Sequence, residues 1–263
     1  MLRVLTYNIH KAIGNDKKYS LDRIIAILKK SQADIIALQE VDFLVPRSHK
    51  ENLALIIAES LNYEYEIGLN VYLKKGAYGN AIFSKYKILH SENLNLTWGI
   101  KKRRGCLMSK ILVPASLFKI KNLEFIEIGV MNFHLGLANF ERVWQVHQML
   151  ESAFFEMMKT HPIICMGDTN DRLSKLDFLF EQVDIIDTFK SITSKKQLKK
   201  FEGNTFPSYT RRPIFRIDKI FINSFWKVEN HQILRDPLAS VASDHYPVLA
   251  DLEIVFPNKK ELK

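Results

Sequence analysis

Short apolar runs recur along the whole chain, and only a few stretches between them carry a helical spacing of apolar residues. A continuous run such as residues 35–38 is typical of a strand that is covered on both faces. Further strands are predicted near residues 2–8, 64–71, 77–84, 106–113, 123–133, 162–166, 214–222, 225–233 and 246–255. Many short strands with few helices favour an α/β protein in which two sheets pack face to face and helices cover their outer faces.

Three segments have the apolar spacing of amphipathic helices. The first follows Ser20, which is the predicted N-cap, and the second covers residues 53–61. A third and longer helix is predicted from an apolar stripe that begins at Phe140 and ends at Met157. His147 lies on this stripe, so it is predicted to be a core histidine and not a metal ligand.

Residues 1–256 are predicted to form one catalytic domain, because no linker rich in proline, glycine or serine interrupts them. Residues 257–263 are predicted to be a flexible basic tail. No apolar run approaches the roughly 20 residues that span a bilayer, and no Sec-type signal precedes the first strand pattern. Cys106 and Cys165 are predicted to be buried free thiols. These features predict a cytoplasmic monomer, with export by a route other than Sec as the open alternative.

The charge balance indicates an anionic partner, because 38 Lys and Arg residues stand against 29 Asp and Glu residues, for a formal net charge of +9. Basic residues form clusters such as Lys101-Lys102-Arg103-Arg104, and others lie at 195–200 and 211–212. Each cluster taken alone fits a solvated loop as well as a phosphate-facing patch. The charge therefore supports an anionic partner without identifying it.

Polar side chains stand where several predicted strands end, which is where α/β folds place their sites. These residues are Asn8, Glu40, His134, Asp168, Asn170, Asp244 and His245. Asp218 instead lies inside the apolar run 215–222, where a carboxylate is costly unless it is paired. A histidine is a natural partner for it, and either His134 or His245 could supply one. Taken singly, Asp168 and Asn170 could equally be turn or cap residues.

The strand-end residues include an oxygen-rich set formed by Asn8, Glu40, Asp168 and Asp244. Such a set suits a hard cation such as Mg²⁺, with Mn²⁺ as the alternative. Zn²⁺ fits less well, because no pair of His or Cys residues has helical or knuckle spacing. A hard cation beside a His–Asp pair and a second histidine is what phosphoester hydrolysis requires.

Seven motifs follow one another along the chain: Tyr7-Asn8-Ile9-His10, Leu38-Gln39-Glu40-Val41-Asp42, Gly79-Asn80-Ala81-Ile82-Phe83-Ser84, Asn132-Phe133-His134-Leu135, Gly167-Asp168-Thr169-Asn170, Ile217-Asp218-Lys219-Ile220-Phe221 and Ser243-Asp244-His245-Tyr246-Pro247. In this order they resemble the endonuclease/exonuclease/phosphatase superfamily. That family includes pancreatic-type deoxyribonuclease, abasic-site endonucleases, inositol polyphosphate 5-phosphatases and neutral sphingomyelinases. The resemblance covers nearly the whole chain and implies a four-layer α/β sandwich.

The resemblance also implies a metal site and phosphate-binding residues. Glu40 resembles the principal metal ligand, with Asn8 near the metal and Asp244 at its edge. Some members carry a carboxylate where this chain has His10. If that carboxylate helps to hold the metal, the site here has one ligand fewer, so one metal is favoured over two and both numbers stay open. The residues that resemble phosphate-binding positions are Asn80, Arg104 and Arg142. A bacterial branch of the family is resembled by the motif Asn8-Ile9-His10-Lys11, by Arg104, and by Arg142 and Gln145 on the third helix.

The proton-handling residues are implied in the same way. Asp168 and Asn170 resemble the pair that orients and deprotonates the attacking water. Asp218 resembles the partner of His245, and His134 resembles a donor to phosphate oxygens. The general base is either Asp168 or the His245–Asp218 pair. We favour Asp168, because a cationic His245 better stabilises the transferring phosphoryl oxygens.

The predicted function is that of a divalent-metal-dependent phosphoesterase that cleaves a phosphodiester by in-line attack of a metal- and Asp-activated water. Loops at 97–105 and 194–212 are predicted to select the substrate, because specificity resides in loops around the sheet ends. Nucleic acid is the favoured substrate. The alternative is a phospholipid or phosphoinositide head group, with peripheral membrane contact. An alternative of another class is a catalytically inactive module that binds phosphate ligands.

Overall fold

The computed structural model describes residues 1–193, 200–210 and 212–255. Within these residues, twelve strands form two sheets of six strands each. The strands are β1 (Leu2–Asn8), β2 (Ile35–Phe43), β3 (Glu64–Tyr72), β4 (Ala77–Ser84), β5 (Lys87–Asn95), β6 (Gly105–Pro114), β7 (Phe125–His134), β8 (Ile163–Asp168), β9 (Ile186–Asp187), β10 (Asp218–Ile222), β11 (Trp226–Ile233) and β12 (Val248–Ile254). The first sheet has the order β11-β12-β1-β2-β4-β3, and the second has the order β5-β6-β7-β8-β10-β9.

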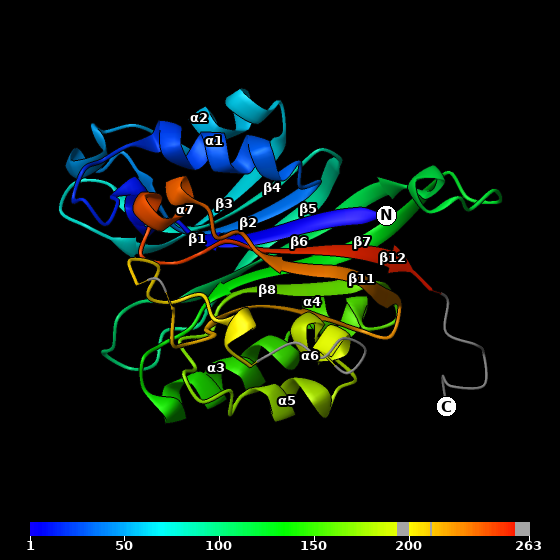
Figure 1. The fold of residues 1–263 in the computed structure, drawn as a ribbon. Coiled ribbons are helices and arrows are strands. Elements are labelled where there is room, and N and C mark those ends of the chain that lie inside the picture. The colour runs from blue at the N-terminus through cyan, green and yellow to red at the C-terminus, as the bar shows by residue number, and fades with distance from the viewer. Residues whose placement is uncertain (194–199, 211, 256–263) are drawn as a thin grey trace.

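Helices cover the outer face of each sheet (Figure 1). The first sheet carries α1 (Leu21–Ser31), α2 (Leu53–Leu61) and α7 (Pro237–Ala242). The second carries α3 (Asn139–Leu150), α4 (Ala153–Met158), α5 (Asp177–Glu181) and α6 (Thr188–Thr193). Short 3₁₀ helices lie at His10–Ala12, Pro46–Ser48, Ala115–Phe118 and Lys200–Gly203. The predicted four-layer α/β sandwich of two mixed sheets flanked by helices is confirmed.

Three apolar clusters hold these layers together. The first lies between the sheets and includes Val4, Ile128 and Ile220, all fully buried. The second joins the first sheet to α1 and α2, and the third joins the second sheet to α3, α4 and α5. Cys106 and Cys165 are buried and free, as predicted. No helix in the described part of the chain is long and apolar enough to cross a membrane.

The register of the strands brings polar residues to one edge of the sandwich. In the first sheet, the parallel strands β1 and β2 place Asn8 opposite Gln39. In the second sheet, the parallel strands β7 and β8 place His134 opposite Asp168. Strand β10 runs antiparallel to β8, so its first residue, Asp218, also pairs with Asp168. This edge is therefore where the predicted site residues converge.

The predicted third helix is wrong in two respects. The segment forms two helices, α3 and α4, because Ser152 breaks the first and caps the second by accepting a hydrogen bond from the backbone N–H of Phe155. The inward face of α3 carries polar residues near its N-terminus, including Arg142 and Gln145, which pack against the loop after β7. Part of the predicted apolar stripe therefore faces solvent. His147 is not a core histidine, since its side chain is 49% exposed.

Two further features of the strands were not predicted. Strand β5 pairs along one edge of the second sheet, and its mostly polar sequence, Lys-Ile-Leu-His-Ser-Glu-Asn-Leu-Asn, has neither the alternation nor the apolar run that indicates a strand. Strand β2 extends to Phe43 through a β-bulge between Leu38 and Val41, where its register against β4 shifts. The predicted tail at 257–263 and part of the predicted loop at 194–212 lie outside the described residues.

Candidate active site

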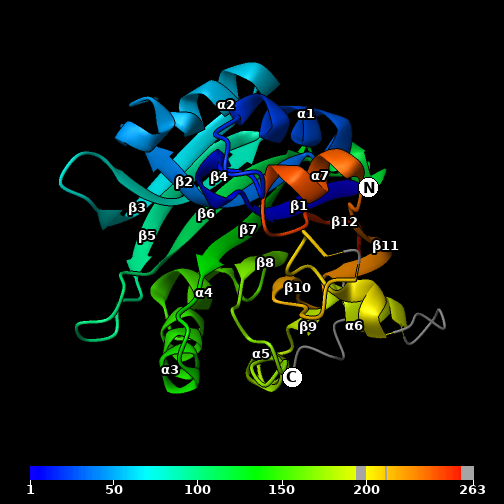
Figure 2. The ribbon, with the colours of Figure 1, turned by 60° about the vertical axis from the view of Figure 1, so that its left-hand side comes forward.

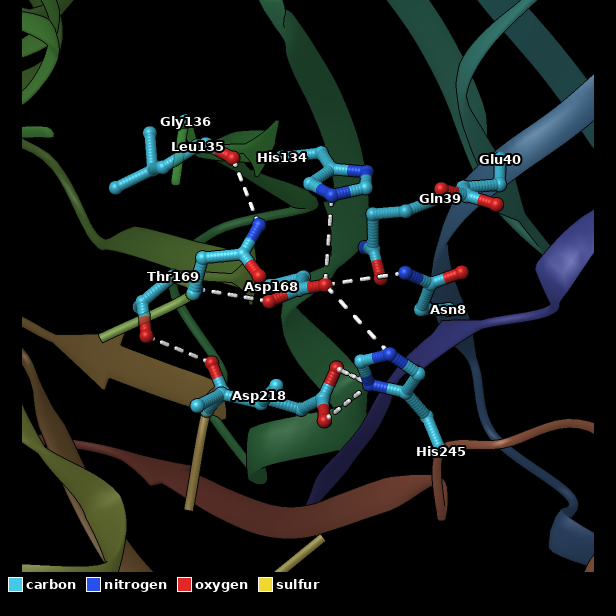
Figure 3. A network of polar contacts seen from close by, with 12 residues as sticks. Asn8, Gln39, Glu40, His134, Leu135, Gly136, Asp168, Thr169, Asp218 and His245 are labelled. Carbon is cyan, nitrogen blue, oxygen red and sulfur yellow. Dashed lines mark hydrogen bonds and ion pairs between the residues drawn. The ribbon is translucent and has the colours of Figure 1, made fainter. Parts of the chain in front are cut away.

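The centre of the site is an acid-supported histidine. Nδ1 of His245 lies 2.9 Å from Oδ2 and 3.1 Å from Oδ1 of Asp218, so Asp218 accepts its proton in a buried ion pair (Figure 3). The backbone N–H of His245 donates to Oγ of Ser243, which fixes the segment before β12. Burial alone would lower the pKa of His245, but Asp218 and then Asp168 outweigh it and raise this pKa to about 10. His245 is therefore an imidazolium at neutral pH.

Asp168 lies at the end of β8 and faces this imidazolium. Its Oδ2 accepts a hydrogen bond from Nδ2 of Asn8 at 3.0 Å and lies 3.4 Å from Nε2 of His134 and 3.8 Å from Nε2 of His245. Its Oδ1 accepts from the backbone N–H of Asn170 at 2.8 Å. Burial raises the pKa of Asp168, and the charge of His245 limits the rise, to about 6. Asp168 is thus ionised at neutral pH and has an elevated affinity for a proton.

Glu40 is aimed into the site by the bulge in β2. Its backbone is left-handed, with φ of 58°, a conformation that is uncommon for a residue with a side chain and that is often found at functional sites. The carboxylate is buried and forms an ion pair with the ammonium group of Lys11. Burial acts to raise the pKa of Glu40, but Lys11 and then Lys102 outweigh it, so this pKa lies below its usual value.

Asp244 lies beside two histidines, His10 and His245. Oδ1 of Asp244 lies 3.8 Å from Nδ1 of His10 and 3.9 Å from Nε2 of His245, and its side chain is partly exposed. Asp244 therefore contacts His10 and His245, whereas Glu40 pairs with Lys11. Asn8 contacts neither Glu40 nor Asp244 through the hydrogen bonds of its side chain. Its Oδ1 accepts a hydrogen bond from the backbone N–H of His10, and its Nδ2 donates one to Asp168.

The donor set fits a divalent cation at Glu40. The carboxylate is buried and holds a cation, the Lys11 ammonium group, so the site stabilises positive charge, and a divalent cation would have to displace Lys11 from it. A second cluster, Asp168, Asp218 and His245, also brings potential ligand atoms within 4.8 Å of one another. In that cluster both oxygens of Asp218 are within hydrogen-bond distance of Nδ1 of His245, so these atoms are already paired with each other.

A basic pocket opens next to Glu40. Its lining includes Tyr78, Asn80, Arg104 and His134. Arg104 is 5% exposed, and within the described residues its Nε has no hydrogen-bond partner and its guanidinium no carboxylate partner. A buried guanidinium with free donors is suited to phosphate oxygens, which it meets as a fork. Burial, and then the charge of Arg104, hold the pKa of His134 well below its usual value, so His134 is neutral.

The other two predicted phosphate-binding residues make backbone contacts. Nδ2 of Asn80 donates to the carbonyl oxygens of Gly105 and Asn132, at 2.9 and 3.2 Å, and so links the two sheets. The guanidinium of Arg142 donates to the carbonyl oxygen of Leu137 at 2.6 Å and lines a separate hollow beside Asn170. Arg104 and Arg142 therefore line different hollows.

One residue of this site received no role from the sequence. Lys11 forms the ion pair with Glu40, but a lysine just after a strand-end motif is indistinguishable in sequence from a solvated surface lysine. The partner of Asp218, which the sequence left open between His134 and His245, is His245.

Comparison with known proteins identifies the family and supports the fold. The model of the Endonuclease/Exonuclease/phosphatase family matches residues 5–245. The uncharacterized protein YbhP of Escherichia coli (strain K12) is 28% identical over 231 residues, which are 84% of this chain and 85% of YbhP. An endonuclease/exonuclease/phosphatase structure from Beutenbergia cavernae has a TM-score of 0.76 at 21% identity, over 96% of this chain and 71% of that one. The mannosyl-6-phosphatase of Bacteroides thetaiotaomicron VPI-5482 has a TM-score of 0.71 at 21% identity, over 97% of this chain and 100% of that one.

Proposed function

Because the chain belongs to the endonuclease/exonuclease/phosphatase family, whose members are hydrolases that act on phosphoesters, we propose that it is a divalent-metal-dependent phosphoesterase. The observation that carries the proposal is the buried series Asp218, His245 and Asp168 beside the unpaired guanidinium of Arg104. Perturbed acids and bases that converge next to a free phosphate-binding group are typical of active sites. A binding module would not need the His245–Asp218 pair.

Asp168 is the proposed general base. It is ionised at neutral pH, and its raised pKa increases its affinity for the proton that a water molecule gives up on attack. Asn170 would help to orient that water, because it follows Asp168 in the same turn. His245 is the less favoured candidate, since its pKa, raised by Asp218 to about 10, supports a protonated imidazole at neutral pH.

The cationic and neutral donors would bind the phosphoryl group. His245 would donate from Nε2 to a phosphoryl oxygen while Asp218 holds Nδ1, and Arg104 and His134 would donate to the others. Glu40 and Asp244 would hold the divalent cation, which, when bound, offsets negative charge on the phosphoryl and leaving-group oxygens. Asn8 would keep Asp168 in place through its 3.0 Å hydrogen bond.

The test is cleavage of two generic substrates, the diester bis(p-nitrophenyl) phosphate and the monoester p-nitrophenyl phosphate. We expect turnover of at least one of them with Mg²⁺ or Mn²⁺ and none with excess chelator. Arg104→Met should raise KM by about tenfold, because a charged donor to phosphate is lost. Arg23→Met, a change on the distant helix α1, should leave KM unchanged. Failure to cleave either substrate with either metal would overturn the proposal.

A further inference from the structure

Two loops from different sheets project on the same side of the site. One is the hairpin turn 73–76 between β3 and β4, and the other is the connection 96–104 between β5 and β6 (Figure 2). The strands that carry them meet at the candidate site, where Nδ2 of Asn80 donates to the carbonyl oxygen of Gly105. The longer loop lines the basic pocket with Arg103 and Arg104, and the strands that carry the turn line it with Val71 and Tyr78.

Each loop presents apolar side chains to solvent. Tyr72 is 65% exposed and Leu73 is exposed beside it, while Ile100 is fully exposed at the tip of the longer loop. Next to that loop, Phe140, whose ring meets that of Trp98, is 55% exposed. We call these residues, together with the cations of the two loops, the site-edge surface. Exposed apolar groups that gather in one place mark an interaction site.

The longer loop is held in position by aromatic packing. The ring of Trp98 meets the ring of Phe140 edge-on, with centroids 5.9 Å apart, and that of Trp144 likewise at 5.1 Å. The ammonium group of Lys101 lies 5.3 Å from the centroid of Phe140. Helix α3 thus supports the loop that carries Ile100, and the apolar tip is presented on a fixed base.

The charges of this surface are all positive. Its cations are Lys74, Lys75, Lys101, Lys102 and Arg103, all exposed. The segments 67–80 and 93–110 contain no Asp or Glu residue. The cationic series continues inward to the buried Arg104. The surface is therefore complementary to a large anionic partner that approaches the site directly.

The exposed aliphatic side chains favour a lipid bilayer over a nucleic acid. A nucleic-acid strand is bound by cations and by aromatic faces on which bases stack, and it gains little from an aliphatic tip. Here the ring of Trp98 is engaged with two other rings, and the most exposed group is Ile100. Aliphatic groups next to lysines are what binding at an anionic membrane surface requires.

We infer that the site-edge surface docks on an anionic lipid bilayer, with Ile100 and Leu73 entering the interface, and that the phosphoester presented to the site belongs to a lipid head group. The substrate part of this inference rests on the proposed function, whereas the docking part does not. Docking brings a head-group phosphate toward Arg104, since the cations of the longer loop lead directly to it.

The test is flotation of the full-length protein with vesicles, in the presence of chelator so that no turnover occurs. Vesicles of phosphatidylcholine alone are compared with vesicles that contain about 30 mol % phosphatidylglycerol. We expect binding to the anionic vesicles and not to the neutral ones. The double variant Leu73→Asp/Ile100→Asp should weaken binding by about tenfold or more. Leu123→Asp changes a similarly exposed loop leucine just before β7, at the opposite end from His134, and should bind as the wild type does.

The outcomes separate the two proposals. Equal binding by the double variant and the wild type, or binding to a DNA or RNA oligonucleotide in place of vesicles, overturns the docking inference. The double variant should still cleave the soluble p-nitrophenyl substrates at the wild-type rate, because neither residue is in the catalytic centre. Vesicle binding without cleavage of any soluble substrate would sink the phosphoesterase proposal and leave docking intact. If the wild type cleaves soluble substrates but does not bind vesicles, the docking inference is overturned and the phosphoesterase proposal stands.

Discussion

Nδ1 of His245 lies 2.9 Å from Oδ2 of Asp218, although the two residues come from different sheets. Asp218 begins β10 in the second sheet, and His245 lies in the segment that leads into β12 of the first. A second bond across the same boundary joins Asn8 of β1 to Asp168 of β8 at 3.0 Å. The candidate centre is therefore built at the junction of the two sheets, and its geometry depends on how they pack (Figure 3).

Asp218→Asn should lower kcat by about 10²- to 10⁴-fold, because an amide no longer stabilises the imidazolium of His245 or fixes its proton on Nδ1. The change is nearly isosteric, so the circular dichroism spectrum should not alter. Steady-state kinetics on a p-nitrophenyl substrate measures the loss. Asp251→Asn, which alters a buried acid paired with Arg3 away from the site, serves as the control and should keep its activity. Equal activities of the two variants would contradict the assigned role of the pair.

Asn132→Leu should lower the free energy of unfolding by about 2–4 kcal/mol, because it leaves buried partners without a hydrogen bond. The fully buried amide of Asn132 donates to the carbonyl oxygens of Leu38 and Ala81 and accepts from Nε2 of Gln39. Urea denaturation measures the change. Asn93→Ala, at an exposed position on β5, should cost far less. A similar loss in both variants would show that the contacts between the sheets contribute little.

The edge at which the site forms could be predicted from the sequence, because strand ends and polar motifs are local patterns. Asn8, His134 and Asp168 follow apolar runs, and the strand register brings them together. The Glu40–Lys11 pair could not be predicted in this way. It depends on a bulge in β2 and on a left-handed residue, neither of which leaves a periodic signal.

The third helix could not be placed correctly for a related reason. Apolar spacing identifies the face of a helix that is buried in an apolar core, but α3 buries Arg142 and Gln145 against the loop after β7. Its exposed Phe140 instead supports Trp98. The buried face of a helix that borders a site can be polar, because it contacts polar groups of that site. Apolar spacing in the sequence does not identify such a face.

Glu40→Gln and Lys11→Met should change the affinity for Mn²⁺ in opposite directions, by about tenfold each. The first removes the proposed ligand charge, and the second removes the ammonium group that occupies the Glu40 carboxylate. Titration of the substrate-free protein followed by electron paramagnetic resonance of free Mn²⁺ measures both. Weaker binding in the Lys11→Met variant would show that Lys11 does not compete with the metal for Glu40.

The stability of the protein should fall in mild acid through His231. Burial lowers the pKa of this histidine, which bonds Oγ1 of Thr188 through Nδ1, to about 4. In the unfolded chain its pKa is about 6.5, so below that pH the unfolded state takes up a proton that the native state excludes. The stabilising effect of the neutral form is present above pH 6.5 and is lost as the pH falls toward 4.

The variant His231→Gln isolates this contribution. Between pH 8 and pH 5, the free energy of unfolding of the wild type should fall by about 2 kcal/mol more than that of the variant. Other titrating groups cancel in the difference. His147→Gln, a change at a half-exposed position on α3, should follow the wild type. Parallel pH profiles for wild type and His231→Gln would refute the assignment.

The most direct test of the central claim is the rate at which Asp168→Asn cleaves a phosphoester that the wild type cleaves with Mg²⁺ or Mn²⁺. The variant keeps the shape of the side chain but cannot accept a proton from water. The account predicts a loss in kcat of about 10³-fold, with the fold unchanged. A rate within about twofold of the wild type at saturating metal would contradict it. Removal of a general base should lower kcat far more than twofold.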